Sequence, residues 1–164
     1  MATQLKNLSD FSHTTIPSGE NFQIGIVTAQ WNAAITNALH AGAYNLLIKQ
    51  GVKEEHITQV SVPGSFELIS GADILLSTSK YDAIICLGCV IKGETPHFDF
   101  ICNAVANGIS QVAIKYTKPV VFGVLTTNNL EQAQERSGGK HGNKGEEAAA
   151  SALLMAELQT NTNA

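Results

Sequence analysis

Four short apolar runs, separated by segments with helical periodicity, constrain the fold of this chain most strongly. The runs cover residues 22–28, 57–62, 83–91 and 120–125, and the longest of them, 83–91, contains no polar side chain. Continuous apolar strands are typical of parallel sheets, whose crossover connections cover both faces. The chain is therefore predicted to form a three-layer αβα structure, with a four-stranded parallel sheet and helices on both faces.

This arrangement is flavodoxin-like, and its 164 residues fit one domain. We expect an N-terminal arm over residues 1–19, ordered only where it docks, a single domain over 20–160 and a polar tail over 161–164. The predicted helices cover residues 33–49, 66–79, 130–136 and 145–159, and a further one opens at Thr95-Pro96. The helix that opens at Thr95-Pro96 carries an apolar stripe to Val112, and Asn128 and Glu131 offer a capping box for the helix at 130–136. Residues 137–143 are predicted to be a Gly-rich loop.

The segment from Gly88 to His97 is the strongest candidate for a reaction centre. Ligands of parallel sheets bind at the carboxyl ends of the strands. Thr95 suits the N-cap of a helix, Pro96 its first turn, and Gly93 a tight turn before it. The unpaired N–H groups of such a helix start can bind an anion, beside a histidine that titrates near neutral pH. Many helices that begin with Thr-Pro bind nothing, however, and His97 would then be an ordinary helix-start histidine.

Three further groups have both a functional and a structural interpretation. Trp31 follows the first strand and either stacks on a flat ligand or packs in a core or interface. Ser65 and Glu67 either hold a polyol or cap the following helix. Arg136 to Lys144 is a basic segment that either supplies a guanidinium to a phosphate or is a solvated connection.

Composition and motifs argue against several other classes of function. A net charge of −4 and a pI near 5.7 argue against nucleic-acid and anionic-membrane partners. Three cysteines and no secretory pattern predict a cytoplasmic protein. Cys86 and Cys89 would point to opposite faces of a strand, so we expect no metal site. Phosphate-loop and dinucleotide motifs are absent from the sequence.

Four motifs, in order, carry a resemblance to a known family that runs from about Phe22 to Gln159. They are IVTAQWN at 26–32, VPGSFE at 62–67, LGCVIKGETPHF at 87–98, and FGVLT at 122–126 with QAQER at 132–136 and GNKG at 142–145. Together they are similar to those of the lumazine synthase family. The resemblance implies an enzyme of riboflavin biosynthesis, a transferase-type condensing enzyme without metal or organic cofactor. It would condense 5-amino-6-(D-ribitylamino)uracil with L-3,4-dihydroxy-2-butanone 4-phosphate and release phosphate and water.

The resemblance also implies a role for each site residue. His97 would be the proton-transfer residue and Trp31 the stacking aromatic. The remaining substrate contacts would be Ser65, Phe66 and Glu67 on the ribityl chain, the backbone of Val90, Ile91 and Lys92 on the pyrimidine, and Phe122 and Lys144. The phosphate would be held by Gly93, Glu94, Thr95 and Arg136.

Members of this family form their sites between subunits of a pentamer. By that resemblance Phe122, Arg136 and Lys144 would come from the neighbouring subunit. Because residues 137–143 carry no insertion typical of pentamer-only relatives, a sixty-subunit shell is favoured, with riboflavin synthase as a candidate partner. Two rival functions stay open at this point, a ligand-binding module without chemistry and a non-catalytic shell protein.

Overall fold

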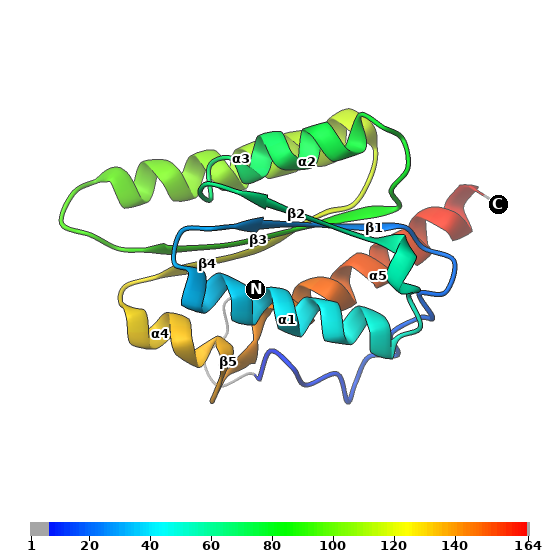
Figure 1. Ribbon diagram of the computed structural model, residues 1–164, viewed down its shortest axis with the longest axis horizontal. Helices are drawn as coiled ribbons and strands as arrows, with labels where there is room; N and C mark the ends of the chain where they lie inside the picture. Colours follow the sequence, from blue (N-terminus) through cyan, green and yellow to red (C-terminus); the bar gives the residue numbers. More distant parts are fainter. Residues whose placement is uncertain (1–6, 164) are drawn as a thin grey trace.

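A four-stranded, all-parallel sheet forms the centre of the protein (Figure 1). The computed structural model describes residues 7–163, with side chains through Thr162. The strands are β1 (Ile24–Ala29), β2 (Ile57–Val62), β3 (Ala83–Ile91) and β4 (Val120–Thr127), in the spatial order β2-β1-β3-β4. The predicted fold class is confirmed, although β1 begins two residues later and β4 ends two residues later than expected.

Burial explains why the two central strands are so uniformly apolar. Every residue of β1 is buried, as are the first seven residues of β3, because helices cover both of their faces. The edge strands β2 and β4 are only partly buried. Cys86 and Cys89 lie in different halves of the core, on opposite faces of β3, as their spacing predicts.

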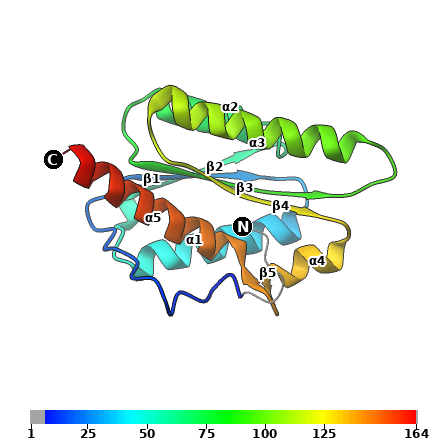
Figure 2. The same cartoon turned by 180° about the vertical axis from the view of Figure 1, so that it is seen from behind.

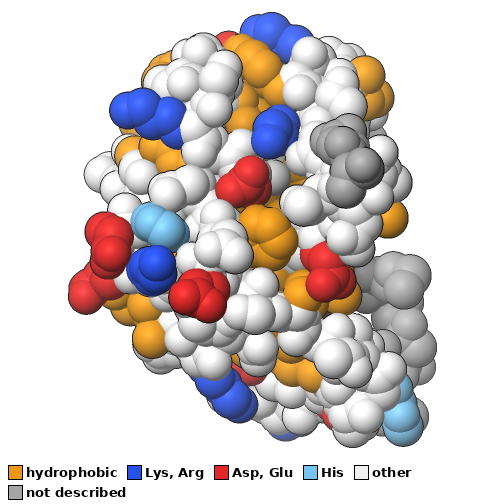
Figure 3. Space-filling view, turned by 90° about the vertical axis from the view of Figure 1, so that its right-hand side faces the viewer, with side chains coloured by type: hydrophobic (Ala, Val, Ile, Leu, Met, Phe, Trp, Pro, Cys, Tyr) orange, Lys and Arg blue, Asp and Glu red, His pale blue; other side chains and the backbone are white. Residues whose placement is uncertain are grey.

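Two helical layers sandwich the sheet (Figures 1 and 2). The helices α1 (Ala33–Lys49), α4 (Leu130–Glu135) and α5 (Lys144–Asn163) lie on one face, and α2 (Leu68–Leu76) and α3 (His97–Tyr116) on the other. A short 3₁₀ turn, η1, covers Glu54–His56. Within residues 7–163, no helix is long and apolar enough to cross a bilayer. Acidic and basic side chains are intermixed on the face shown in Figure 3.

The strand order places a crevice at one end of the sheet. From β1 the chain passes through α1 to β2 on one side, then through α2 to β3 on the other side of β1. The loops that leave β1 and β3 therefore turn to opposite faces, and the crevice lies between them. Such reversals of strand order are where ligands bind in open α/β sheets.

Some local predictions were wrong in detail. Helix α2 covers 68–76 rather than 66–79. The predicted capping box of Asn128 and Glu131 is displaced by one residue: Asn129 Oδ1 accepts from the Gln132 N–H at 2.9 Å, and Gln132 Oε1 accepts from the Asn128 N–H at 3.0 Å. The cap lies at Asn129 because this residue has the extended backbone (φ −152°, ψ 171°) from which α4 starts.

The segment predicted as a loop at 137–143 is a small antiparallel hairpin. It pairs β5 (Ser137–Gly139) with β6 (Gly142–Asn143), and the Lys144 N–H continues it by donating to Arg136 O at 2.9 Å. Asn143 is buried and fastens the hairpin to α1, because its Nδ2 donates to Ala38 O at 2.9 Å. Its Oδ1 accepts from the Gly145 N–H at 2.8 Å, so one side chain joins the hairpin, α1 and the start of α5.

The described part of the N-terminal arm docks on its own chain. The Leu8 N–H donates to His141 O at 2.7 Å, and Phe11 and Ile16 pack against the core cluster to which α1 and α5 contribute. At the other end of the chain α5 continues to Asn163, past the predicted end at 159 and through most of the predicted polar tail. Residues 1–6 of the arm and residue 164 of the tail lie outside the described residues.

Candidate active site

A cleft of about 540 Å³ opens at the carboxyl ends of β1, β2 and β3. Three segments far apart in the sequence meet there, one from the end of each strand. The lining residues are Trp31, Asn32, Gly64, Ser65, Phe66, Glu67, Cys89, Val90, Ile91, Gly93, Thr95, His97, Phe98 and Ile101. Nine of the fourteen were singled out from the sequence, so the structure brings most of the candidate site together.

Trp31 stands at the mouth of the cleft with 73% of its side chain exposed. This exposure rules out the interpretation as a packed core tryptophan within the subunit. The turn that carries it is tied to the end of β2, because Gln30 N–H donates to Val62 O at 2.8 Å and Trp31 N–H donates to Pro63 O at 3.2 Å. An indole that no core packing requires is suited to stack on a ligand ring.

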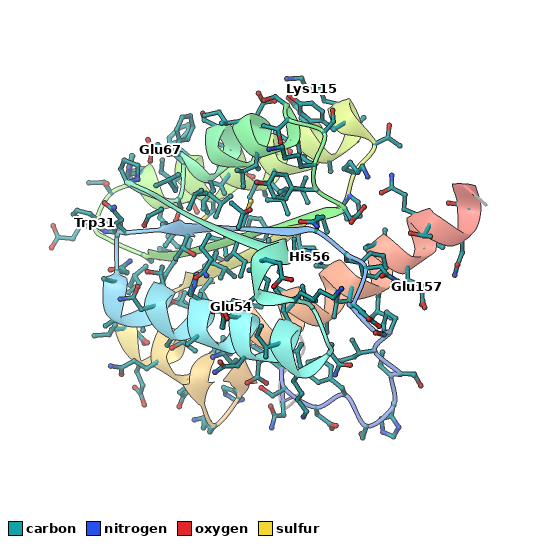
Figure 4. All side chains as sticks on the ribbon, turned by 45° about the vertical axis from the view of Figure 1, so that its right-hand side comes forward. Trp31, Glu54, His56, Glu67, Lys115 and Glu157 are labelled. Atoms are coloured by element: carbon teal, nitrogen blue, oxygen red, sulfur yellow. The ribbon has the colours of Figure 1, made fainter. Side chains whose placement is uncertain are left out.

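The turn from Pro63 to Glu67 forms the wall next to Trp31 (Figure 4). Ser65 is buried against Gly88 of β3, where an added Cβ would lie 2.7 Å from Ser65 Oγ. Glycine at position 88 therefore lets the turn approach the strand. Helix α2 begins at Leu68 with Glu67 in the cap position, but no side-chain cap bond forms, so neither the Ser65 hydroxyl nor the Glu67 carboxylate caps the helix. Their polar groups remain available to a ligand.

The end of β3 forms the opposite wall. Lys92 N–H donates to Thr127 O at 2.8 Å, which extends the pairing with β4 to the last residue before the turn. Val90 and Ile91 are half-buried and line the cleft with Cys89. Burial raises the pKa of the Cys89 thiol to about 11, so this sulfur is a protonated, weakly reactive neighbour.

The start of α3 differs from the prediction in two respects. The helix begins at His97, Pro96 occupies the cap position with helical backbone (φ −62°, ψ −4°), and no side-chain cap bond forms, so Thr95 is not the cap. Gly93 does not have a positive φ, so the turn does not require glycine. An added Cβ at Gly93 would meet nothing within 4 Å. The feature of Gly93 that matters for a ligand is therefore the unoccupied space beside its Cα, and not an unusual backbone conformation.

The residues before α3 combine free amides with an accessible imidazole. Within residues 7–163, the N–H groups of Gly93, Glu94 and Thr95 have no backbone acceptor. His97 is exposed, lines the cleft and lies at the positive end of the α3 dipole. The arrangement can bind an anion and transfer a proton next to it.

Five predicted site residues do not line this cleft. Lys92 and Glu94 are exposed beside it, on the segment that enters α3. Phe122 lies on β4 and packs partly against the core under α2 and α3. Arg136 Nη1 donates to Gln132 O at 3.1 Å, and Lys144 Nζ lies 3.0 Å from Glu147 Oε2, both on the face of α1, α4 and α5. Among the residues that the structure describes, no lysine or arginine lines the cleft.

Five lining residues were not predicted as site residues. Asn32, Gly64 and Cys89 adjoin predicted ones within the same motifs, so their position at strand ends was a usable signal. Phe98 and Ile101 belong to the apolar stripe predicted for α3. Apolar residues at helical spacing look the same in the sequence whether they line a cleft or pack in the core, so no pattern identified these two as lining residues.

Comparison with known proteins identifies the family. The family model described as 6,7-dimethyl-8-ribityllumazine synthase matches residues 21–160. A protein of that name from Cytophaga hutchinsonii is 55% identical over 155 residues, covering 94% of this chain and 97% of its own. One from Flavobacterium johnsoniae is 50% identical over 159 residues, covering 97% of this chain and 84% of its own. The chain therefore belongs to the 6,7-dimethyl-8-ribityllumazine synthase family.

Proposed function

We propose that this protein is a 6,7-dimethyl-8-ribityllumazine synthase and that the cleft at the ends of β1, β2 and β3 is its active site. It condenses 5-amino-6-(D-ribitylamino)uracil with L-3,4-dihydroxy-2-butanone 4-phosphate and releases phosphate and water. The observation that carries the proposal is the convergence of Trp31, Glu67 and His97 on one cleft at the strand ends, within the residues that the family model matches.

The pyrimidine would lie between Trp31 and the end of β3. The exposed indole would stack on its ring, and the backbone from Val90 to Lys92 would bind its polar edge. The ribityl chain would run along the turn of Ser65, Phe66 and Glu67. Support comes from the hydroxyl and carboxylate of that turn, which α2 does not use as caps.

The phosphate would lie over Gly93, Glu94 and Thr95. Their N–H groups donate to no backbone carbonyl within residues 7–163, and no neighbouring residue there would contact a Cβ added at Gly93. Glu94 would contribute its backbone, since a carboxylate would repel the phosphate. The helix dipole of α3 adds a favourable field for an anion.

His97 would transfer protons as the imine forms and as phosphate leaves. Its exposed position beside the anion site allows it to reach a substrate in the cleft. General acid–base catalysis of this kind contributes about 10²–10⁴-fold. Holding the two substrates together would supply much of the remaining acceleration.

Within residues 7–163, no lysine or arginine lines the cleft of one subunit, which supports a site shared between subunits for a doubly charged phosphate. In the proposed assembly Phe122, Arg136 and Lys144 of a neighbouring subunit complete the site, and the guanidinium pairs with the phosphate. A pentamer, its assembly into a sixty-subunit shell and a partnership with riboflavin synthase are parts of this proposal. So is a cytoplasmic location, which three free cysteines support.

Turnover with a histidine control tests the proposal. The purified protein should form the lumazine, followed by its absorbance, and release one phosphate per product. His97→Ala should lower kcat by about 100-fold with each KM changed less than about threefold. His13→Ala, which removes an exposed histidine of the arm, is the matched control and should retain full kcat. A protein that binds the lumazine but never forms it would be the binding module instead.

A further inference from the structure

The position of the Trp31 ring depends on its backbone rather than on side-chain packing. With 73% of the side chain exposed, few neighbours hold the indole. A stacking residue binds its ligand more tightly when its plane is fixed before the ligand arrives, because less conformational freedom is then lost on binding. Whatever fixes the turn from Gln30 to Asn32 therefore fixes the stacking surface.

The two sides of this turn are held by different means. Toward β2, the backbone bonds of Gln30 and Trp31 continue the pairing of the strands. Toward β3, the ladder ends at the pair Thr28–Leu87. Beyond that pair, one hydrogen bond joins the turn to β3 within residues 7–163: Asn32 Nδ2 donates to Cys89 O at 3.0 Å.

Asn32 departs from the ordinary behaviour of an asparagine at a helix start. It precedes α1 but makes no side-chain cap bond, and its backbone is left-handed (φ 61°, ψ 46°). Asparagine is one of the few residues other than glycine that tolerate this conformation. Its carbonyl, not its side chain, accepts from the Ile35 N–H at 2.8 Å. The amide side chain is thus turned away from the helix and across the cleft floor.

We infer that Asn32 is a positioning residue, which sets the spacing between the Trp31 ring and the backbone of Cys89 to Ile91. The inference rests on the proposed function, because these are the two surfaces between which the pyrimidine would bind. The left-handed backbone aims the amide at β3, and the hydrogen bond holds the two walls at one separation before substrate arrives. Asn32 acts through Trp31 and Cys89 and need not touch the substrate itself.

Three variants separate the hydrogen bond from the backbone conformation. Asn32→Gly keeps the left-handed conformation and loses the hydrogen bond. Asn32→Asp keeps the preference for helix starts but directs a carboxylate oxygen at Cys89 O. Ser79→Gly is the matched control, since Ser79 also has a positive φ (57°) but lies before β3, at the opposite end of the sheet.

Two readouts are needed, and one does not depend on turnover. Trp31 is the only tryptophan, so time-resolved fluorescence anisotropy of the ligand-free protein reports its ring alone. Asn32→Gly should increase the fast, sub-nanosecond loss of anisotropy by about twofold. It should also raise the KM for the pyrimidine by about tenfold, the effect expected from the loss of one hydrogen bond. The kcat and the KM for the butanone phosphate should change by less than about twofold. Asn32→Asp should be at least as impaired, and Ser79→Gly should match the parent in both measurements.

Several outcomes would overturn the inference. Parent-like anisotropy in Asn32→Gly, whatever its KM, would show that Asn32 does not hold the turn. A normal Asn32→Asp would show that the residue acts only at the start of α1. Failure of the parent to turn over would refute the proposed function, yet the anisotropy comparison would still decide whether Asn32 positions Trp31. Unchanged far-UV circular dichroism of each variant confirms that the comparison is made between folded proteins.

Discussion

Substituting Gly93 by alanine should weaken phosphate binding without destabilising the protein. Apart from Gly93 and its two chain neighbours, no atom of residues 7–163 lies within 4 Å of the Cβ that alanine would add, and the backbone of Gly93 does not have the positive φ that disfavours other residues. Alanine at such a position restricts the unfolded chain, which stabilises a protein by about 0.4–1 kcal/mol. For a domain of this size we expect the Tm to rise by about 1–4 °C at equal subunit concentration.

The added methyl group would occupy the space in which the phosphate is proposed to lie. A phosphate oxygen displaced from one N–H group loses a charge-assisted hydrogen bond of about 1.5–3 kcal/mol. That loss corresponds to an increase of about 10- to 150-fold in the KM for the butanone phosphate, or in the Kd of inorganic phosphate measured by calorimetry. The KM for the pyrimidine should change by less than about twofold.

Gly64→Ala is the matched control for this experiment. Its Cβ would lie 3.1 Å from Glu67 Oε2, on the side of the cleft where the ribityl chain is proposed to bind. It should therefore alter the KM for the pyrimidine and spare that for the phosphorylated substrate. A Gly93→Ala protein with parental phosphate affinity would refute the placement of the phosphate. A Gly93→Ala protein with a Tm several degrees below that of the parent would refute the inference that a Cβ at position 93 meets no neighbouring residue.

Two further predictions concern stability. Asn143→Ala should lower the free energy of unfolding by about 2–4 kcal/mol, because it leaves two backbone groups, the partly buried Ala38 O and the buried Gly145 N–H, without their partner. Asn129→Ala, which removes an exposed helix cap, should lower it by only about 1 kcal/mol. Equal losses of the two variants in urea titrations would contradict this account. Burial raises the pKa of Cys86 from 9.0 to about 12, so the unfolded thiol ionises first, and stability that is complete below pH 9 should fall as pH rises from there toward 12, by at most about 1.4 kcal/mol per pH unit. Cys86→Ala should flatten that decline, and an unchanged slope would count against the assignment.

The sheet could be predicted from the sequence because its signal is local and redundant. The strands β2 and β3 have the predicted bounds, since β-favouring residues in each run end at turn residues, Pro63 after β2 and Lys92 after β3. Helix starts were less predictable. Thr95 and Asn128 both have suitable cap chemistry, but the cap position is set by the backbone of the residue next to each.

The candidate site was predictable where its residues follow strands and was not where they depend on tertiary contacts. Trp31 lies two residues after β1 and His97 six residues after β3, so the sheet topology brings them together. The role of Asn143 depends on contacts with Ala38 and with Ser9, which lie 105 and 134 residues away in sequence. No spacing rule connects such partners, and the same holds for the hairpin that Asn143 anchors.

The direction of α5 has a practical consequence for work with this protein. The helix starts beside the hairpin and ends at Asn163, on the far side of the sheet from Trp31 (Figure 4). A dye, affinity tag or surface-coupling group attached after this helix would be remote from the proposed active-site cleft of its own subunit. Immobilised protein could then be supplied with substrates while its tryptophan emission is recorded without interference from the attachment.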